Sequence, residues 1–322
     1  MADVEVDLLV VGAGPTGLFA AYYAGFRDLS VAVVDSLPEL GGQITAMYPE
    51  KQILDVAGFP SVKGRDLVAD LVRQAATSDP TYLLERTATM LEAREDGVTV
   101  TLDDGTAVQA GAVIVTAGIG KFSPRPLPAG DGWLGRGMEF FVPDFEPYHG
   151  KDVVVVGGGD SAFDWAQHLE PVAASVTLVH RRDRFRAHER TVQQVQASSV
   201  EVITKAEVSA LLGGDTLESV EISVGGETLH RPAQAVIAAL GFVADLGALK
   251  EWGLQIDKRN VVVDSAMRTN VPRIFAAGDI TEYPGKVRLI AVGFGEAATA
   301  VNNAAVAIDP GAKVFPGHSS DA

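Results

Sequence analysis

The chain has 322 residues, of which 47% are hydrophobic and 21% are charged. This length is enough for about two domains with cores of their own, and the apolar content is too high for a disordered chain. The formal net charge of −16 argues against binding to nucleic acids or to anionic membranes. The chain contains no cysteine. That excludes a structural disulfide, a cysteine nucleophile, a cysteine-ligated iron–sulfur cluster and a redox-active C-x-x-C pair.

The apolar stretch 8–26 is not interpreted as a signal peptide. It is preceded by Asp3, Glu5 and Asp7 rather than by basic residues, and it contains a glycine-rich turn. No apolar run reaches the length of an uninterrupted membrane helix. We therefore expect a soluble, cytoplasmic protein.

The first predicted unit has the order strand, turn, helix, strand. Residues 6–11 are apolar and β-branched, as in a buried parallel strand. Residues 18–24 fit a helix, with Gly25 as its stop. Residues 31–34 form the next predicted strand, which ends in Asp35.

The turn of this unit, residues 12–17, matches the pattern G-x-G-x-x-G. Gly12 permits the tight turn, Gly14 lets the backbone approach a pyrophosphate, and Gly17 lets helix and strand pack closely. Asp35 lies about where an adenosine ribose needs a hydrogen-bond acceptor. The pattern predicts a dinucleotide site, and an acid at this position suits FAD, whose ribose carries no 2′-phosphate.

A second unit repeats this order. Residues 153–156 form a predicted strand, followed by a turn, a helix that runs to about Glu170 before Pro171, and a strand over 176–179. Each unit continues into a predicted hairpin and strand. The hairpin turns lie at 104–105 in the first unit and at 225–226 in the second.

The second turn carries the variant G-x-G-x-x-A, formed by Gly157, Gly159 and Ala162. The strand that follows ends in basic residues, among them Arg181, Arg182 and Arg186. Arginines bind a 2′-phosphate that an acid would repel. The second unit is therefore predicted to bind NADP, so that a hydride passes between the two dinucleotides.

The stretch after residue 245 contains "RIFAAGDI" and "GFGEAATAVNNAA" but no third glycine turn of this kind, so it is expected to rejoin one of the two units. The Pro-rich segment 122–128 is a predicted linker. In "GFGEAATA" the glycine pair is predicted to open a helix at about Glu296, with its N–H groups toward the flavin.

Together, "VVGAGPTGLFAA", "GGQITAMYPEK", "DVAGFP", "GGGDSAFDWA", "HRRDRFRAHE", "AAGDI" and "GFGEAATAVNNA" resemble the ferredoxin–NADP⁺ reductases of the thioredoxin-reductase-like type, over essentially the whole chain. The resemblance implies an α/β fold with two Rossmann-like dinucleotide-binding domains of the pyridine-nucleotide-disulfide-reductase type, the first one discontinuous. We expect an FAD-binding domain over 1–120 and 245–322, and an NADP-binding domain over 121–244. It further implies a homodimer.

The resemblance also implies site residues. Tyr48 would stack on one face of the flavin, and His318 would cover the other face from the partner subunit; no acid or base residue and no metal is expected. Where this chain has Asp35, the family often has glutamate. The implied FAD contacts are Thr16, Asp35, Gln43, Tyr48, Ala88, Phe122, Asp279 and Ser320.

The activity implied is hydride transfer between NADPH and FAD, with single electrons passing between FAD and ferredoxin or flavodoxin. The alternatives are an NADPH-dependent reductase of free flavin or ferric complexes, and a non-catalytic nucleotide-binding redox sensor. Thioredoxin reductase itself is excluded because the chain has no cysteine pair. Lys51, Lys63 and Arg65, close to Tyr48 in sequence, are candidates for a basic patch that receives an acidic ferredoxin.

Overall fold

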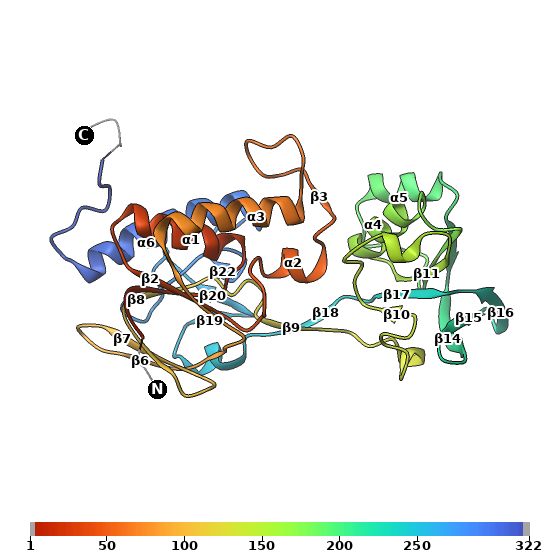
Figure 1. Ribbon diagram of the computed structural model, residues 1–322, viewed down its shortest axis with the longest axis horizontal. Coiled ribbons are helices and arrows are strands. Elements are labelled where there is room, and N and C mark those ends of the chain that lie inside the picture. The colour runs from red at the N-terminus through yellow and green to blue at the C-terminus, as the bar shows by residue number, and fades with distance from the viewer. Residues whose placement is uncertain (1–3, 318–322) are drawn as a thin grey trace. The chain divides into compact units, whose positions relative to one another are not determined.

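The computed structural model describes residues 4–317. The chain divides into two units. Unit 1 comprises Met1–Lys121 and Ala244–Ala322, and unit 2 comprises Phe122–Val243. The two segments at which the chain passes between the units, β9 (Lys121–Pro124) and β18 (Phe242–Asp245), pair with each other (Figure 1).

The described part of unit 1 is built on a seven-stranded sheet. Two of its pairings are antiparallel, and one of them, between residues 98–102 and 107–115, is the hairpin predicted around Gly105, whose φ is +85°. The remaining pairings are parallel. In order, its strands are β5 (Thr81–Leu84), β2 (Val31–Asp35), β1 (Val4–Val11), β8 (Ala107–Val115), β7 (Val98–Leu102) and β6 (Ala88–Ala93), with β21 (Ile274–Ala276) paired to β8.

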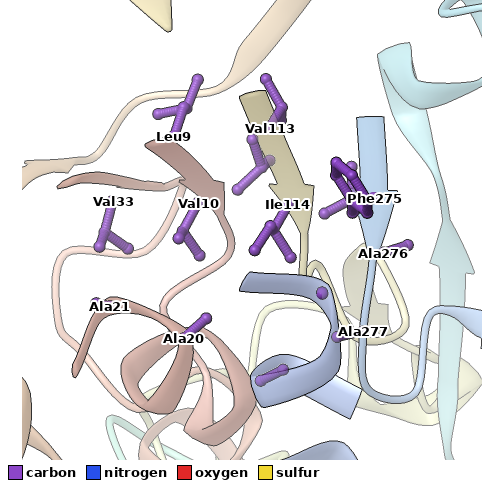
Figure 2. Packing of buried hydrophobic residues seen from close by; sticks show 14 of the residues in the cluster. Leu9, Val10, Ala20, Ala21, Val33, Val113, Ile114, Phe275, Ala276 and Ala277 are labelled. Atoms are coloured by element: carbon purple, nitrogen blue, oxygen red, sulfur yellow. The ribbon is translucent and has the colours of Figure 1, made fainter. Parts of the chain in front are cut away.

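The central strands of unit 1 are buried on both faces because their sequences are nearly continuous runs of apolar, mostly β-branched residues. Leu9 and Val10 of β1 lie beside Val113 and Ile114 of β8, and Phe275 of β21 continues this row (Figure 2). The stretch after residue 245 thus returns to the first sheet.

Three helices cover one face of this sheet: α1 (Pro15–Phe26), α3 (Gly64–Ala75) and α6 (Ile290–Ile308) (Figure 1). The prediction that Gly25 stops α1 is wrong. The helix continues through Gly25 to Phe26. A Cβ on Gly25 would lie 2.1 Å from Oγ of Ser78, so glycine is required there for close packing rather than for ending the helix.

The smaller elements of unit 1 connect these layers. They are α2 (Gln43–Met47), β3 (Gln52–Ile53), β4 (Val62–Lys63), η1 (Ala76–Ser78), η4 (Gly247–Glu251), β19 (Ile256–Asp257), β20 (Asn260–Val262) and β22 (Thr281–Glu282).

Unit 2 has its own five-stranded parallel sheet and a separate three-stranded antiparallel sheet. The antiparallel sheet contains the predicted hairpin, in which Gly225 and Gly226 both have positive φ. The parallel strands, in order, are β10 (Met138–Glu139), β17 (Ala235–Ala239), β11 (Asp152–Gly157), β12 (Ser175–His180) and β13 (Glu201–Thr204). The antiparallel strands are β14 (Ala206–Gly213), β15 (Leu217–Val224) and β16 (Glu227–Pro232); the helices are α4 (Asp160–Leu169), α5 (Glu189–Gln196), η2 (Pro128–Gly130) and η3 (Glu146–Tyr148).

The two units share a pattern. In each, the strand before the glycine turn (β1 or β11) lies between the next strand (β2 or β12) and a later parallel strand. That later strand is the second arm of the predicted hairpin in unit 1 (β8) and follows the hairpin in unit 2 (β17). The predicted α/β class with two Rossmann-like domains, the first one discontinuous, is confirmed.

Candidate functional site

The first glycine turn has the three properties that its sequence pattern predicts. Gly12 has φ of +115°, and a Cβ there would lie 2.5 Å from the carbonyl oxygen of Thr116. A Cβ on Gly17 would lie 1.8 Å from the carbonyl oxygen of Gly12, so only glycine lets α1 pack this closely. Around Gly14, no described atom outside its chain neighbours lies within 4 Å of an added Cβ. The backbone at Gly14 is therefore open to a ligand.

Asp35, at the end of β2, is bound to this turn. Its Oδ2 accepts the N–H of Ala13 at 2.6 Å, and its Oδ1 accepts the N–H of Leu37 at 2.9 Å. Burial nevertheless raises the pKa of the Asp35 carboxyl, against the lowering effect of these N–H groups. A carboxylate has about four lone-pair positions, so Asp35 retains acceptor capacity for a ribose hydroxyl.

The loop after β2 lies against the turn. The N–H of Gly41 donates to the carbonyl of Ala13 at 2.9 Å, and a Cβ on Gly42 would lie 2.9 Å from Cα of Gly14. Gln43 opens α2, and its Nε2 lies 2.8 Å from the position of a Cβ on Gly118, just beyond β8. The structure thus places Gln43 beside the glycine turn.

Tyr48 follows α2 directly. Burial raises the pKa of its hydroxyl to about 12, and the nearby carboxylates of Asp279 and Asp55 add to the effect. Nζ of Lys51 lies 5.9 Å from the centre of the Tyr48 ring. Tyr48, the residue predicted to stack on the flavin, therefore lies close enough to Asp279 for their charges to interact, although the two residues are far apart in sequence.

The stretch after residue 245, here called the third stretch, meets the start of α1. Cβ atoms added to Gly278 and Gly293 would lie 2.8 Å and 2.5 Å from Oγ1 of Thr16. Asp279 follows Gly278, and Nδ2 of Asn260 donates to its carbonyl at 2.8 Å. Burial raises the pKa of the Asp279 carboxyl. Of the predicted FAD contacts, Thr16, Asp35, Gln43, Tyr48 and Asp279 therefore all lie in unit 1 around its glycine turn and the third stretch.

The prediction that a helix opens at about Glu296 is wrong. Helix α6 begins at Ile290 and runs through both glycines. Glu296 therefore lies in the second turn of the helix, where its side chain is only 5% exposed. Glycine is tolerated inside α6 because Gly293 packs against Thr16 with no room for a side chain. The N–H groups near Glu296 are used within the helix and cannot face a ligand as predicted.

The other residues predicted to contact FAD are Ala88, Phe122, His318 and Ser320. Ala88 is buried at the start of β6, opposite Leu102 of β7. The side chain of Phe122 lies outside what the structure describes, although its backbone belongs to β9. His318 and Ser320 lie outside the described residues.

The second glycine turn is built in the same way. A Cβ on Gly157 would lie 2.3 Å from the carbonyl oxygen of Ala239 and 2.9 Å from Cβ of Ala162. Gly159 precedes the first residue of α4, and no described atom beyond its chain neighbours lies within 4 Å of an added Cβ. Gly157 and Ala162 therefore allow close packing, and Gly159 allows a ligand to approach.

The segment 181–188, here called the arginine loop, folds back over this turn. The N–H of Arg186 donates to the carbonyl of Gly158 at 2.7 Å, and the N–H of His188 donates to Oδ1 of Asp160 at 2.8 Å. The ring of Phe185 fixes the loop from within, because it packs on Phe163 at 4.8 Å between ring centres. The backbone of the loop is thus attached to the turn that it follows.

Arg181, Arg182 and Arg186 converge near this turn. All three are exposed. Burial lowers the pKa of the His180 ring, and the positive charges of the three arginines lower it further. The ring of His180 lies against Gly158, where an added Cβ would be 2.3 Å from its Cε1. The structure therefore groups the three predicted phosphate-binding arginines around His180 and the turn.

The candidate basic patch differs from the expectation. Lys63 lies 3.4 Å from the buried carboxylate of Glu50, which is also paired with Arg65. Two of the three predicted cations are therefore offset by a carboxylate, and the patch carries less positive charge than the sequence suggested.

Sequence reasoning missed two features of these sites. One is the contact of His180 with Gly158, for which the middle glycine of "GGGD" was the available signal. The other is a buried ion pair between Lys286 and Glu296, at 2.5 Å. A lysine in a loop and a glutamate ten residues later inside a helix give no local pattern. Among residues 4–317 no group of three or more His, Cys, Asp or Glu side chains is arranged to hold a metal ion.

Comparisons with known proteins agree with this architecture. A family model described as pyridine nucleotide-disulphide oxidoreductase matches residues 6–309. A protein of Nocardioides sp. (strain ATCC BAA-499 / JS614) named ferredoxin–NADP reductase is 77% identical, with 99% of this chain and 98% of the relative covered. A protein of the same name from Saccharopolyspora erythraea is 64% identical, with 98% of each chain covered.

Among solved structures, a thioredoxin reductase of T. acidophilum is similar, with a TM-score of 0.78 and 26% identity over 95% of this chain and 98% of its own. The match of the family model over nearly the whole chain, with two glycine turns on two related sheets, settles the family. The chain belongs to the pyridine nucleotide-disulphide oxidoreductase family.

Proposed function

We propose that this protein is an FAD-containing ferredoxin–NADP reductase, which transfers a hydride between NADPH and FAD and single electrons between FAD and ferredoxin. The main observation behind the proposal is that equivalent positions of the two units carry charges of opposite sign. Asp35 is the last residue of β2 in unit 1, and the arginine loop directly follows β12, the equivalent strand of unit 2. The names and high identity of the relatives support the same activity.

The residues of unit 1 fit FAD. The open backbone at Gly14 leaves room for a pyrophosphate, and α1 directs its N-terminus to the same place. Asp35 would accept from the adenosine ribose, Asp279 from the ribityl region, and Tyr48 would lie against the ring system. When bound, FAD supplies two-electron exchange with NADPH and one-electron exchange with a carrier.

The residues of unit 2 fit NADP. Gly159 leaves the backbone open at the start of α4 for the pyrophosphate. Arg181 and Arg182 would bind the 2′-phosphate through charge-assisted hydrogen bonds, with Arg186 alongside. Their exposure supports this role. In the described part of unit 2, no carboxylate forms an ion pair with any of these three arginines.

The electron acceptor must be a separate molecule, because the chain has no cysteine to receive electrons. We propose ferredoxin as this carrier, with flavodoxin as a second carrier of the same kind. Free flavin and ferric complexes are the competing acceptors, and an inactive nucleotide sensor is the competing role.

A single experiment separates these possibilities. The visible spectrum of the purified protein should show bound FAD, close to one per chain. NADPH oxidation should then be followed with ferredoxin, flavodoxin, free flavin or a ferric chelate as acceptor. Turnover that depends on ferredoxin is expected. Turnover with only free flavin or ferric chelate would replace the proposal with a flavin or ferric reductase, and no turnover with any acceptor would favour the sensor.

We further propose that the protein is a cytoplasmic homodimer, on the strength of the resemblance. Within residues 4–317, no helix combines the length and apolar character needed to span a membrane. Sedimentation equilibrium of the FAD-loaded protein should give twice the mass of 33.8 kDa calculated for one chain. A single-chain mass at micromolar concentration would contradict the dimer.

A further inference from the structure

A buried carboxylate organises the third stretch of the chain. Oε2 of Glu296 accepts the N–H of Gly278 at 2.7 Å, and Oε1 accepts the hydroxyl of Tyr283 at 2.5 Å. Nζ of Lys286 lies 2.5 Å from Oε1 and also donates to the carbonyl of Gly278 at 2.9 Å. The side chains of Lys286 and Glu296 are 2% and 5% exposed. The segment 278–286 is thus folded around one carboxylate of α6.

This cluster lies at the edge of the proposed FAD site. Gly278, which Glu296 and Lys286 hold by both its N–H and its carbonyl, is adjacent in sequence to Asp279 and in contact with Thr16 of α1. Any shift of Gly278 would therefore move the carboxylate of Asp279 relative to the glycine turn. The pair itself is too deeply buried to contact a ligand directly.

Four charged or titratable groups act on Asp279. Lys286 and Arg288 favour its ionised form, whereas Glu296 opposes it. Burial raises the pKa of the Tyr48 hydroxyl most, and the charge of Asp279 adds to this rise, so Tyr48 is the fourth group. Arg288 is half-exposed and paired with Glu282, so its effect is screened by solvent. Lys286 and Glu296 are therefore the two groups whose charges act on Asp279 through the interior.

The stability of the fold alone does not explain an ion pair this buried, because the cost of desolvating the two charges commonly equals or exceeds their Coulombic attraction. We propose that Lys286 and Glu296 are positioning residues for FAD: together they fix the backbone at Gly278, and Lys286 neutralises Glu296 so that Asp279 stays an ionised acceptor. This inference rests on the proposed function, since it assumes that Asp279 binds FAD.

The test is FAD binding to the apo-protein across acid and neutral pH, measured by quenching of FAD fluorescence. Binding weakens wherever Asp279 becomes protonated. Lys286→Met removes a cation and should shift this loss of binding to higher pH. Glu296→Gln removes a like charge and should shift it to lower pH. Each should also raise the FAD Kd at neutral pH by about tenfold or more, because charge-assisted hydrogen bonds to Gly278 are lost.

A purely structural role predicts a different result. General loosening of the loop would weaken binding in both variants without moving the pH dependence in opposite directions, and that outcome overturns the proposal. In an Asp279→Asn background, the same two substitutions should no longer shift the pH dependence. If they still do, the charge pair acts through another group, and the proposal fails.

Three further variants keep the test decisive. The double variant Lys286→Met with Glu296→Gln leaves no unpaired charge, so it should fold. Its FAD binding should depend on pH nearly as in the unaltered protein. A shift of this pH dependence as large as that in either single variant would contradict the proposal. Glu296→Asp keeps the charge but shortens the side chain, and should weaken FAD binding without shifting the pH dependence.

A control removes the more exposed ion pair Arg231–Glu201 of unit 2, as Arg231→Met with Glu201→Gln. It should change neither the FAD Kd nor its pH dependence. An unaltered apo-protein that does not bind FAD would refute the proposed function instead.

Discussion

The two glycine turns differ in how they are attached to the chain at the end of the next strand, β2 or β12. In unit 1 the attachment is a side chain: the carboxylate of Asp35 accepts the N–H of Ala13 within the turn. In unit 2 it is backbone: the N–H of Arg186 donates to the carbonyl of Gly158. The arginine side chains are thus free of structural duty, whereas Asp35 both builds its turn and would bind its nucleotide. We therefore expect charge at the arginine loop to change without altering the turn, whereas loss of the Asp35 carboxylate also removes a hydrogen bond that holds the turn of unit 1.

The largest expected effect is on the free energy of unfolding, at Gly17, where α1 packs closely on the glycine turn of unit 1. Gly17→Ala places a Cβ 1.8 Å from the carbonyl oxygen of Gly12, and backbone cannot yield as a side chain can. We expect a loss of more than about 3 kcal/mol in the free energy of unfolding, together with loss of FAD. Urea denaturation of apo-protein measures this.

Gly14→Ala is the matched control, since its added Cβ meets open space at an allowed φ of −70°. Its free energy of unfolding should change by less than about 0.5 kcal/mol, while FAD binding weakens. Equal losses of stability at Gly14 and Gly17 would contradict the roles given to the two glycines.

The arginine loop should provide the next largest effect. Replacing either Arg181 or Arg182 with alanine removes charge-assisted hydrogen bonds of roughly 1.5–3 kcal/mol. The KM for NADPH should rise about 10–100-fold for each, with the KM for NADH, the FAD content and the melting temperature unchanged. Equal use of NADPH and NADH by the unaltered protein would contradict the assignment of unit 2.

A smaller effect should come from the contact beneath the loop. Gly158→Ala places a Cβ 2.3 Å from the His180 ring, so the ring must leave its place beside the carbonyl of Arg184. Losing one hydrogen bond of about 0.5–1.5 kcal/mol should raise the KM for NADPH about threefold to tenfold. Steady-state kinetics test this. Unchanged KM in a folded Gly158→Ala variant would mean that the ring does not position the loop.

An effect that is absent at neutral pH concerns the alkaline stability of unit 1. Because the pKa of Tyr48 is raised to about 12 in the folded protein from 10, the tyrosine contributes stability that is fully present below pH 10. That contribution is lost as the pH rises through 12, since the unfolded chain ionises first. Tyr48→Phe should therefore lessen the loss of stability between pH 10 and pH 12 by up to about 2 kcal/mol, as measured by urea denaturation.

Tyr148 of unit 2 offers a control, since burial and Glu139 also raise the pKa of its hydroxyl. Tyr148→Phe should lessen the same alkaline loss without altering the visible spectrum of bound FAD, whereas Tyr48→Phe should alter both. If the FAD spectrum responds to Tyr148 and not to Tyr48, the tyrosine assigned to the flavin is wrong.

Local patterns predicted much of the fold. The glycine turns, the strands on either side of them and both hairpins follow from spacing and turn chemistry, which act over a few residues. The same rules failed at Gly25 and at the start of α6. There Gly25 and Gly293 are required by contacts with Ser78 and Thr16, which are distant in sequence.

The candidate site could be predicted from the sequence at positions where the charge of the residue matches one group of the ligand. Asp35 and the arginine loop are such cases, because charge sign alone relates them to a ribose hydroxyl or a 2′-phosphate. The pairing of Glu50 with Lys63 and Arg65, and of Glu296 with Lys286, could not be read from the sequence. These carboxylates acquire their partners only when separate elements pack together.

The central claim is that unit 1 binds FAD and unit 2 binds NADPH, and equilibrium binding of both ligands to two variants tests it most directly. Asp35→Ala should lose FAD and still bind NADPH. The double variant Arg181→Ala with Arg182→Ala should keep FAD and lose its preference for NADPH over NADH. The account would be contradicted if the arginine variant released FAD while its NADPH affinity stayed intact, or if Asp35→Ala kept FAD and lost NADPH.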